Sequence, residues 1–274
     1  MRLKSASFRG FKRFAHLTIS DLSPANRLVL LIGPNGCGKS SVFDGFRFWQ
    51  SRKGTYHNFQ SDDEYYYRTT HRLRDPVDIT FHGEHHPCST DFYIRSAYRN
   101  TPEFNVGNIR KLEEMDRSPR LIRRTIDNDV SIEENYNRVV SYVLRDVFNH
   151  ENDQVASKEL RERITSQLDQ ALADVGLDLR IASLGEPDPL SNGNFFFCKG
   201  DIDRYNFKNL SGGEKAAFDL ILDILIKREM FENTVFCIDE PELHLHTKLQ
   251  GRLLKTLCSL VPSSSQLWIT THSI

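Results

Sequence analysis

The sequence predicts an α/β fold built on a mostly parallel sheet. Three short, largely apolar runs lie at residues 28–32, 234–238 and 267–269, and stretches with helical spacing separate them. Unbroken apolar runs are typical of strands buried on both faces, and alternation of strands with helices is typical of parallel sheets. The 274 residues are expected to form a single domain that carries an insertion.

The chain is expected to open with an antiparallel hairpin. Apolar residues near two-residue spacing on either side of residues 9–14 predict two strands and a turn: Leu3, Ala6, Phe8, Leu17 and Ile19. The run Leu28–Ile32 has no charged residue and leads into a glycine-rich loop, as expected of a strand buried on both faces. A helix should follow from Lys39 and pack on the sheet through Val42, Phe46 and Trp49.

The next segment mixes irregular and extended patterns. Residues 51–75 are polar, charged and aromatic without a clean period, and we interpret them as a surface excursion. Val77–Phe81 and Asp91–Arg95 are predicted strands, with a hairpin turn between them that explains Gly83 and Pro87.

An inserted helical lobe is expected over about residues 101–200. Ser131 and Glu134 form a capping box before one helix, and a second helix is predicted from about Ser157 to Gly176. The segment has no sustained heptad pattern, so these helices are not expected to form a long coiled coil. The core lobe then comprises residues 1–100 and 201–274, and the fold is expected to continue beyond Ile274.

The last part of the chain alternates strands and helices. Asn194–Cys198 predicts a strand that leads back to the core lobe, and a helix is expected from Gly213 to about Met230. The strand Thr234–Ile238 follows, and the strand Leu267–Ile269 closes the pattern. Between these two strands, a helix is marked by a leucine stripe: Leu249, Leu253, Leu257 and Leu260.

Composition argues against a strongly charged binding protein, a disulfide-linked secreted protein and a membrane protein. The formal net charge is −1, so no global field attracts nucleic acid or anionic lipid. The five cysteines match no disulfide framework, and neither a signal peptide nor a long apolar run is visible. We expect a reduced, cytoplasmic protein without a membrane partner.

The glycine-rich loop has the sequence of a phosphate-binding loop, or P-loop, and lies between a predicted strand and a predicted helix, as that motif requires. Backbone N–H groups of such a loop converge on phosphates, and the helix adds the positive end of its dipole. Lys39 is expected to hold the β- and γ-phosphates of ATP, and Ser40 to contact Mg²⁺. The candidate ATP-binding residues here are Gly33, Pro34, Asn35, Gly36, Cys37, Gly38, Lys39, Ser40 and Ser41.

Further motifs follow the P-loop in a fixed order. Ser211, Gly212 and Gly213 open a helix and offer a second anion-binding turn. Asp239 and Glu240 end an apolar strand, where carboxylates are unfavourable unless they meet a metal or move a proton. His272 follows another apolar strand, at the edge of the sheet where open α/β folds bind ligands.

Together these motifs resemble those of the ABC-class ATPases, particularly the SMC, RecF and OLD-type branch. The resemblance implies that Asp239 orients Mg²⁺, that Glu240 polarises the attacking water, and that His272 donates a hydrogen bond to the γ-phosphate. It also implies a homodimer in which Ser211, Gly212 and Gly213 of one copy bind the nucleotide held by the other. The expected catalytic residues are Glu240, His272 and Lys39, and the expected metal ligands are Ser40 and Asp239.

One part of the family's site has no match in this chain. The family places a glutamine at the end of a strand between the P-loop and the helical lobe, but no glutamine occurs from Ser61 to Asp153. That role stays open, with Arg95 and Arg99 as candidates.

Other polar clusters have simpler interpretations. The spacing of His82, Glu84, His85, His86 and Cys88 matches no standard zinc site. His244 and His246 lie in the position of the family's D-loop, which favours a protomer interface over a metal site. A basic segment with interleaved acidic residues favours a solvated helical face over contact with DNA phosphates: Arg110, Lys111, Arg117, Arg120, Arg123 and Arg124.

We therefore expect an ATP hydrolase whose nucleotide-driven dimerisation switches DNA-linked work, such as repair or defence against phage, together with a nuclease effector. Two alternatives are the nucleotide-binding subunit of a transporter and a slow ATP sensor that scaffolds an effector. Glu214 and the loop Pro241–His246 argue against the transporter subunit, which typically carries glutamine after the two signature glycines.

Overall fold

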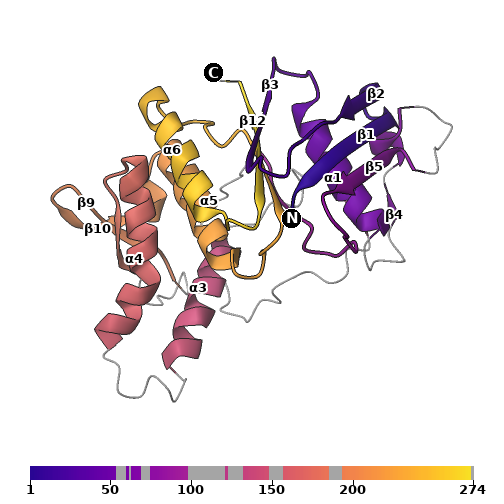
Figure 1. Cartoon of the computed structure of the whole chain (residues 1–274). Coiled ribbons are helices and arrows are strands. Elements are labelled where there is room, and N and C mark those ends of the chain that lie inside the picture. The colour runs from indigo at the N-terminus through magenta and orange to yellow at the C-terminus, as the bar shows by residue number, and fades with distance from the viewer. Residues whose placement is uncertain are drawn as a thin grey trace.

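A four-stranded parallel sheet lies at the centre of the molecule, in the order β3-β12-β11-β6. The computed structural model describes residues 1–53, 60–61, 63–68, 75–97, 121–122, 132–147, 157–184 and 193–272. The strands are β3 (Leu28–Ile32), β12 (Gln266–Thr271), β11 (Val235–Asp239) and β6 (Phe92–Arg95). In Figure 1 the N-terminal elements lie on one side of these strands, and helices α3 to α6 lie on the other. The predicted α/β class with a mostly parallel sheet is confirmed.

The side chains of β11 and β12 alternate between two hydrophobic cores. Val235, Cys237 and Trp268 face the N-terminal side. On the side of the helices, the buried residues are Phe236, Ile238, Leu267 and Ile269. Strands covered on both faces need apolar residues at every position, which explains the unbroken apolar runs in the sequence.

The N-terminal core is filled by helix α1 (Lys39–Lys53) and an antiparallel sheet in the order β2-β1-β5. The predicted hairpin is formed by β1 (Leu3–Phe11) and β2 (Phe14–Ile19), but its turn is only Lys12-Arg13, shorter than expected. Strand β5 (Val77–Phe81) completes this sheet. As predicted, Val42, Phe46 and Trp49 on α1 are buried, and the Phe46 ring meets Trp268 edge to face.

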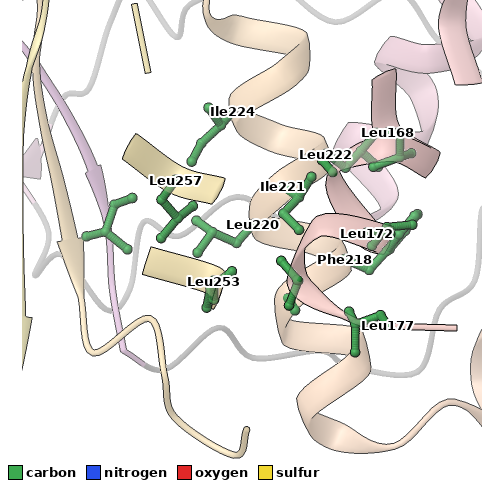
Figure 2. Close-up of a cluster of buried hydrophobic side chains, with 14 of the residues drawn as sticks. Leu168, Leu172, Leu177, Phe218, Leu220, Ile221, Leu222, Ile224, Leu253 and Leu257 are labelled. Carbon is green, nitrogen blue, oxygen red and sulfur yellow. The ribbon is translucent and has the colours of Figure 1, made fainter. Parts of the chain in front are cut away.

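Four helices build the second core: α3 (Ile132–Val147), α4 (Ser157–Val175), α5 (Gly212–Lys227) and α6 (Thr247–Leu260). Figure 2 shows leucines of α4, α5 and α6 converging between these helices. Each fully buried leucine contributes about 1.5–3 kcal/mol relative to an exposed one, so this packing holds α5 firmly in place. The predicted end of the second lobe helix is confirmed, because α4 stops before Gly176, whose φ of 90° is in the left-handed region.

A small antiparallel sheet, in the order β10-β9-β8, lies beside α4 (Figure 1). It consists of β8 (Arg180–Ser183), β9 (Phe196–Lys199) and β10 (Ile202–Asn206), and a 3₁₀ turn, η3 (Phe207–Asn209), leads to α5. The strand predicted at Asn194–Cys198 is therefore present but begins two residues later, whereas β8 and β10 were not predicted. The remaining short elements are β4 (Gln60–Ser61), α2 (Asp63–Tyr66) and β7 (Leu121–Ile122).

Three sequence predictions about burial and connection are wrong. Leu28, Leu30 and Ile32 are exposed, because α5 and α6 cover β11 and β12 but not the outer strand β3. The strands β5 and β6 are not a hairpin, because β5 pairs with β1 and β6 with β11. Residues 51–75 are not all surface, because Tyr66 is fully buried and its ring lies against Phe11 and Phe48.

Some predictions fall outside the described residues. These are the capping residue Ser131, the first part of the helical pattern at residues 101–120, Arg99 and the basic segment that includes Arg120, Arg123 and Arg124. The division into a core lobe and an inserted lobe stays a prediction.

Candidate nucleotide-binding site

The glycine-rich loop joins the end of β3 to the start of α1 in a backbone path that needs glycine. Gly36 and Gly38 have φ values of 73° and 107°, which other residues adopt only with strain. A Cβ atom on Gly38 would also lie 2.7 Å from Cδ of Arg13 and 2.8 Å from the Phe14 ring. The tip of the N-terminal hairpin therefore lies directly against the loop, whose residues 34–37 are exposed to a ligand.

Lys39 begins α1 and its ammonium group lies within this loop. The side chain is largely buried, and Nζ donates to the carbonyl oxygens of Gly33 at 2.8 Å and Pro34 at 3.3 Å. Nζ also lies 3.1 and 3.3 Å from the two ring nitrogens of His272. A cation in this position, at the positive end of a helix, suits a phosphate group.

Asp239 and Ser40 meet at the carboxyl edge of β11. Burial raises the pKa of Asp239, and hydrogen bonds from the hydroxyl groups of Thr270 and Ser40 partly offset that rise. The two predicted metal ligands thus supply one carboxylate and one hydroxyl oxygen. Hard oxygen donors of this kind, few in number and completed by phosphates, fit Mg²⁺.

Glu240 adopts a strained backbone conformation directly after the strand. Its φ is 44°, and its N–H donates to the carbonyl oxygen of Thr270 at 3.1 Å and to the Thr270 hydroxyl at 3.0 Å. Residues held in this region cost about 1–3 kcal/mol and cluster at functional sites. The conformation turns the Glu240 carboxylate toward His272, whose Nε2 it contacts.

His272 is the point where these elements meet. Its Nδ1 lies 3.1 Å from the Gly33 carbonyl oxygen, and the ring also contacts Lys39 and Glu240. Lys39, Glu240 and His272, far apart in the sequence, are therefore brought together beside the glycine-rich loop.

The Ser211 turn is built as a helix cap. Ser211 and Glu214 form a capping box, and Lys199 lies 2.8 Å from the Glu214 carboxylate. Burial favours protonation of Glu214, but the bonds from Lys199 and Ser211 outweigh it, so the pKa of Glu214 is lowered. Within the described residues, the hydrogen bonds of Ser211 go to Glu214 and Lys215, not to Lys39 or His272.

The two glycines of this turn have different surroundings. A Cβ on Gly213 would lie 2.5 Å from the carbonyl oxygen of His244, whereas a Cβ on Gly212 would meet open space. Gly213 therefore allows α5 to pack on the loop that follows Glu240, and Gly212 faces outward.

Arg95 does not fill the open glutamine role in this structure. Its guanidinium group is fully buried and donates to Asp223 at 2.7 Å and to Asp219 at 2.6 Å, both on α5. Asn135 on α3 donates to Asp219 at 3.0 Å, and Lys227 lies 2.6 Å from Asp223. This charged cluster joins β6 to the helix that begins at the Ser211 turn.

Sequence reasoning missed several of these residues. Thr270 and Thr271 end an apolar strand, which is a visible signal that the strand's edge carries chemistry. Asp219 and Asp223 gave no signal, because carboxylates four residues apart on a helix usually face solvent.

Neither histidine group forms a metal site. Among the described residues, no three or more histidine, cysteine, aspartate or glutamate side chains gather as metal ligands would. His85 and Cys88 both contact Asp91, and His246 is the N-cap of α6.

No helix in the described part of the chain combines the length and the apolar character that spanning a bilayer requires.

Comparison with known proteins gives a family match and matches to curated relatives. Residues 28–274 match the family described as "AAA domain, putative AbiEii toxin, Type IV TA system". The chromosome partition protein Smc of Delftia acidovorans is 35% identical over 91 residues, which are 31% of this chain and 8% of that protein. The DNA double-strand break repair Rad50 ATPase of Saccharolobus solfataricus is 29% identical over 83 residues, 30% of this chain and 10% of that protein. The matches thus span about a tenth or less of these curated relatives.

Two solved structures were compared with this chain. The Smc head bound to the C-winged helix domain of ScpA has a TM-score of 0.53 at 14% identity, over 100% of this chain and 90% of that chain. The SMC head domain from Thermotoga maritima has a TM-score of 0.43 at 17% identity, with the same coverage. The first likeness shows that the fold is that of an SMC head.

Proposed function

Because this chain belongs to the AAA-domain family and is a P-loop ATPase of the SMC and Rad50 type, we propose that two copies of it enclose ATP and Mg²⁺ and hydrolyse the nucleotide. The observation that carries the proposal is the convergence of Lys39, Glu240 and His272 on the glycine-rich loop.

Binding is the task of the loop and of α1. Backbone N–H groups of Asn35, Gly36 and Gly38 and the N-terminus of α1 would surround the phosphates, and Lys39 would neutralise their charge. Ser40 and Asp239 would hold Mg²⁺, which supplies charge stabilisation to the β- and γ-phosphates. Burial raises the pKa of Asp239, which means that its charged form is disfavoured there. A nearby Mg²⁺ ion would stabilise the charged form, which supports this role.

Hydrolysis is the task of Glu240 and His272. Glu240 would accept the proton of the attacking water, and its contact with His272 Nε2 orients the carboxylate. His272 and Lys39 would donate hydrogen bonds toward the γ-phosphate as negative charge develops on it.

The second copy would complete the site through its Ser211 turn. Ser211 is bonded within its own cap, and Gly212 faces outward, so the turn offers backbone N–H groups and a helix dipole to a ligand held by another protomer. This arrangement favours a homodimer with the nucleotide at the interface.

The wider role we propose is DNA-linked, in repair or antiviral defence, with a nuclease effector. The support is the named roles of the relatives, in chromosome partition and double-strand break repair, and the toxin description of the family. All five cysteines are free thiols, which favours the cytoplasm as the setting.

Two variants test the proposal. Glu240→Gln should abolish turnover while ATP still binds and induces a dimer, whereas Lys39→Ala should lose ATP binding itself. Turnover, ATP affinity and mass in solution are measured for both variants and for the wild type. Loss of ATP binding in Glu240→Gln, or absence of turnover in the wild type, would contradict the proposal.

A further inference from the structure

One carboxylate contacts both Thr271, the last residue of β12, and His272, the residue that follows it. Oε1 of Glu242 accepts a hydrogen bond from the hydroxyl group of Thr271. The same oxygen accepts the backbone N–H of His272 at 3.3 Å. Glu242 itself lies two residues after Glu240, so a single short turn supplies both the predicted base and this anchor.

His272 needs an anchor of this kind. The pairing of β12 with β3 ends at Thr271, so His272 is the first residue beyond the sheet. Its side chain is 32% exposed, and apolar packing therefore does not fix the ring. The position of the imidazole depends on where the backbone of residues 271–272 is held and on the polar groups around the ring.

The turn that carries Glu242 is itself fixed. The N–H of Leu243 donates to the carbonyl oxygen of Glu240 at 3.1 Å, and the N–H of Leu245 donates to that of Glu242 at 3.0 Å. The start of α5 packs against the carbonyl group of His244 so closely that only glycine fits at position 213. The carboxylate of Glu242 is thus presented from a rigid turn braced by α5.

We propose that Glu242 is a positioning residue for ATP hydrolysis, which holds the end of β12 so that His272 faces Glu240 and Lys39. The inference rests on the proposed function. Glu242 contacts the backbone of His272 and the side chain of Thr271, not the reacting atoms, so it acts through the position of the histidine ring. Displacement of a catalytic group by about 1 Å can lower the rate on the order of 100-fold, so loss of the anchor should act on kcat.

The first test separates binding from turnover. Glu242→Ala should lower kcat by about 10-fold or more, while KM and ATP affinity change by less than about twofold. Glu242→Gln should keep most of the wild-type kcat, because its amide oxygen still accepts both hydrogen bonds. Glu232→Ala, an exposed carboxylate in the loop before β11, is the matched control and should leave kcat unchanged. Equal loss in the glutamine and alanine variants would overturn the positioning role.

The second test asks whether Glu242 acts through His272. In a His272→Ala background, Glu242→Ala should lower kcat by less than about twofold further, because the ring that it positions is already gone. A full additional loss in the double variant would show that Glu242 acts elsewhere. Thermal unfolding of each variant shows whether a lost rate reflects a lost fold. Thr271→Val, which removes the hydroxyl donor to Glu242, and Thr271→Ser, which keeps it, form a second pair of variants.

The outcomes distinguish this inference from the proposed function. Wild-type kcat in Glu242→Ala, with kcat lowered in His272→Ala, would overturn the inference and leave the proposed function standing. Wild-type kcat in His272→Ala would contradict the proposed function, and the inference with it.

Discussion

Replacing Arg95 with methionine removes a cation that two buried carboxylates share. The cluster of Arg95, Asp219, Asp223 and Lys227 is electrically balanced, with two charges of each sign, and all four side chains are buried. In Arg95→Met, Asp223 keeps Lys227 at 2.6 Å, whereas Asp219 keeps only the amide of Asn135 among its described partners. The variant therefore buries one uncompensated carboxylate.

The expected loss of stability follows from this one uncompensated buried charge. Removing one partner of a buried ion pair costs about 3–5 kcal/mol, which lowers Tm by roughly 5–9 °C in a chain of this size. The double variant Arg95→Met/Asp219→Asn removes the stranded charge as well and should recover most of the loss, because Asp223 and Lys227 then remain as a balanced pair and no uncompensated charge is buried. Arg9→Met, an exposed arginine on β1, should change stability by less than about 0.5 kcal/mol.

The loss should also depend on pH. Burial raises the pKa of Asp219, so its folded-state pKa lies above its unfolded value. A group of this kind favours the folded state when protonated, and its contribution is lost as pH rises. The deficit of Arg95→Met should therefore be smaller at about pH 5 than at about pH 8, since the stranded carboxyl can take up a proton.

Thermal and urea unfolding followed by circular dichroism measure these differences at both pH values. A loss below about 1 kcal/mol in Arg95→Met, or no recovery in the double variant, would refute the assignment of the cluster as a buried ion network.

Two further predictions concern the site itself. Asp239→Asn should abolish Mg²⁺-dependent turnover yet raise the nucleotide-free Tm at neutral pH, because the buried carboxylate has a raised pKa and destabilises the fold as pH rises. The gain in Tm should shrink toward about pH 4, and a lowered Tm at pH 7 would contradict this reasoning. Gly213→Ala should destabilise the domain by about 1–3 kcal/mol through its clash with His244, whereas Gly212→Ala should keep the wild-type Tm. Urea unfolding of the two variants checks this, and equal stability would contradict the packing described for α5.

The sequence predicted the strands of the central sheet well where they are buried on both faces. Residues 235–238 of β11 and 267–269 of β12 are apolar at every position because two cores cover them. The same reasoning was wrong for β3, because an apolar run of five residues does not reveal whether a strand lies inside a sheet or at its edge. Pairing partners of β5 and β6 were likewise beyond local pattern, since they depend on the order of strands in space.

The candidate site was predictable where its residues sit at fixed points of the chain. Lys39 starts a helix after a glycine-rich loop, and Glu240 and His272 follow apolar strands, so their meeting at one edge follows from parallel topology. Glu242 and Arg95 were not predictable, because their roles depend on which backbone or helix lies opposite them. Those partners are set by tertiary packing, which leaves no periodic mark in the sequence.

The central claim is that one copy's P-loop and another copy's Ser211 turn form a single site, and mixing two inactive variants tests it. Homodimers of Lys39→Ala lose both phosphate sites, and homodimers of Ser211→Arg block both anion-binding turns with bulk and charge, so each variant alone should be inactive. In a mixed dimer one site collects both lesions, while the other joins an intact Lys39 to an intact Ser211. ATP-dependent dimerisation and ATP turnover should therefore return in the mixture, with both variants shown to be folded. If neither returns, each protomer completes its own site and the shared-site account is wrong.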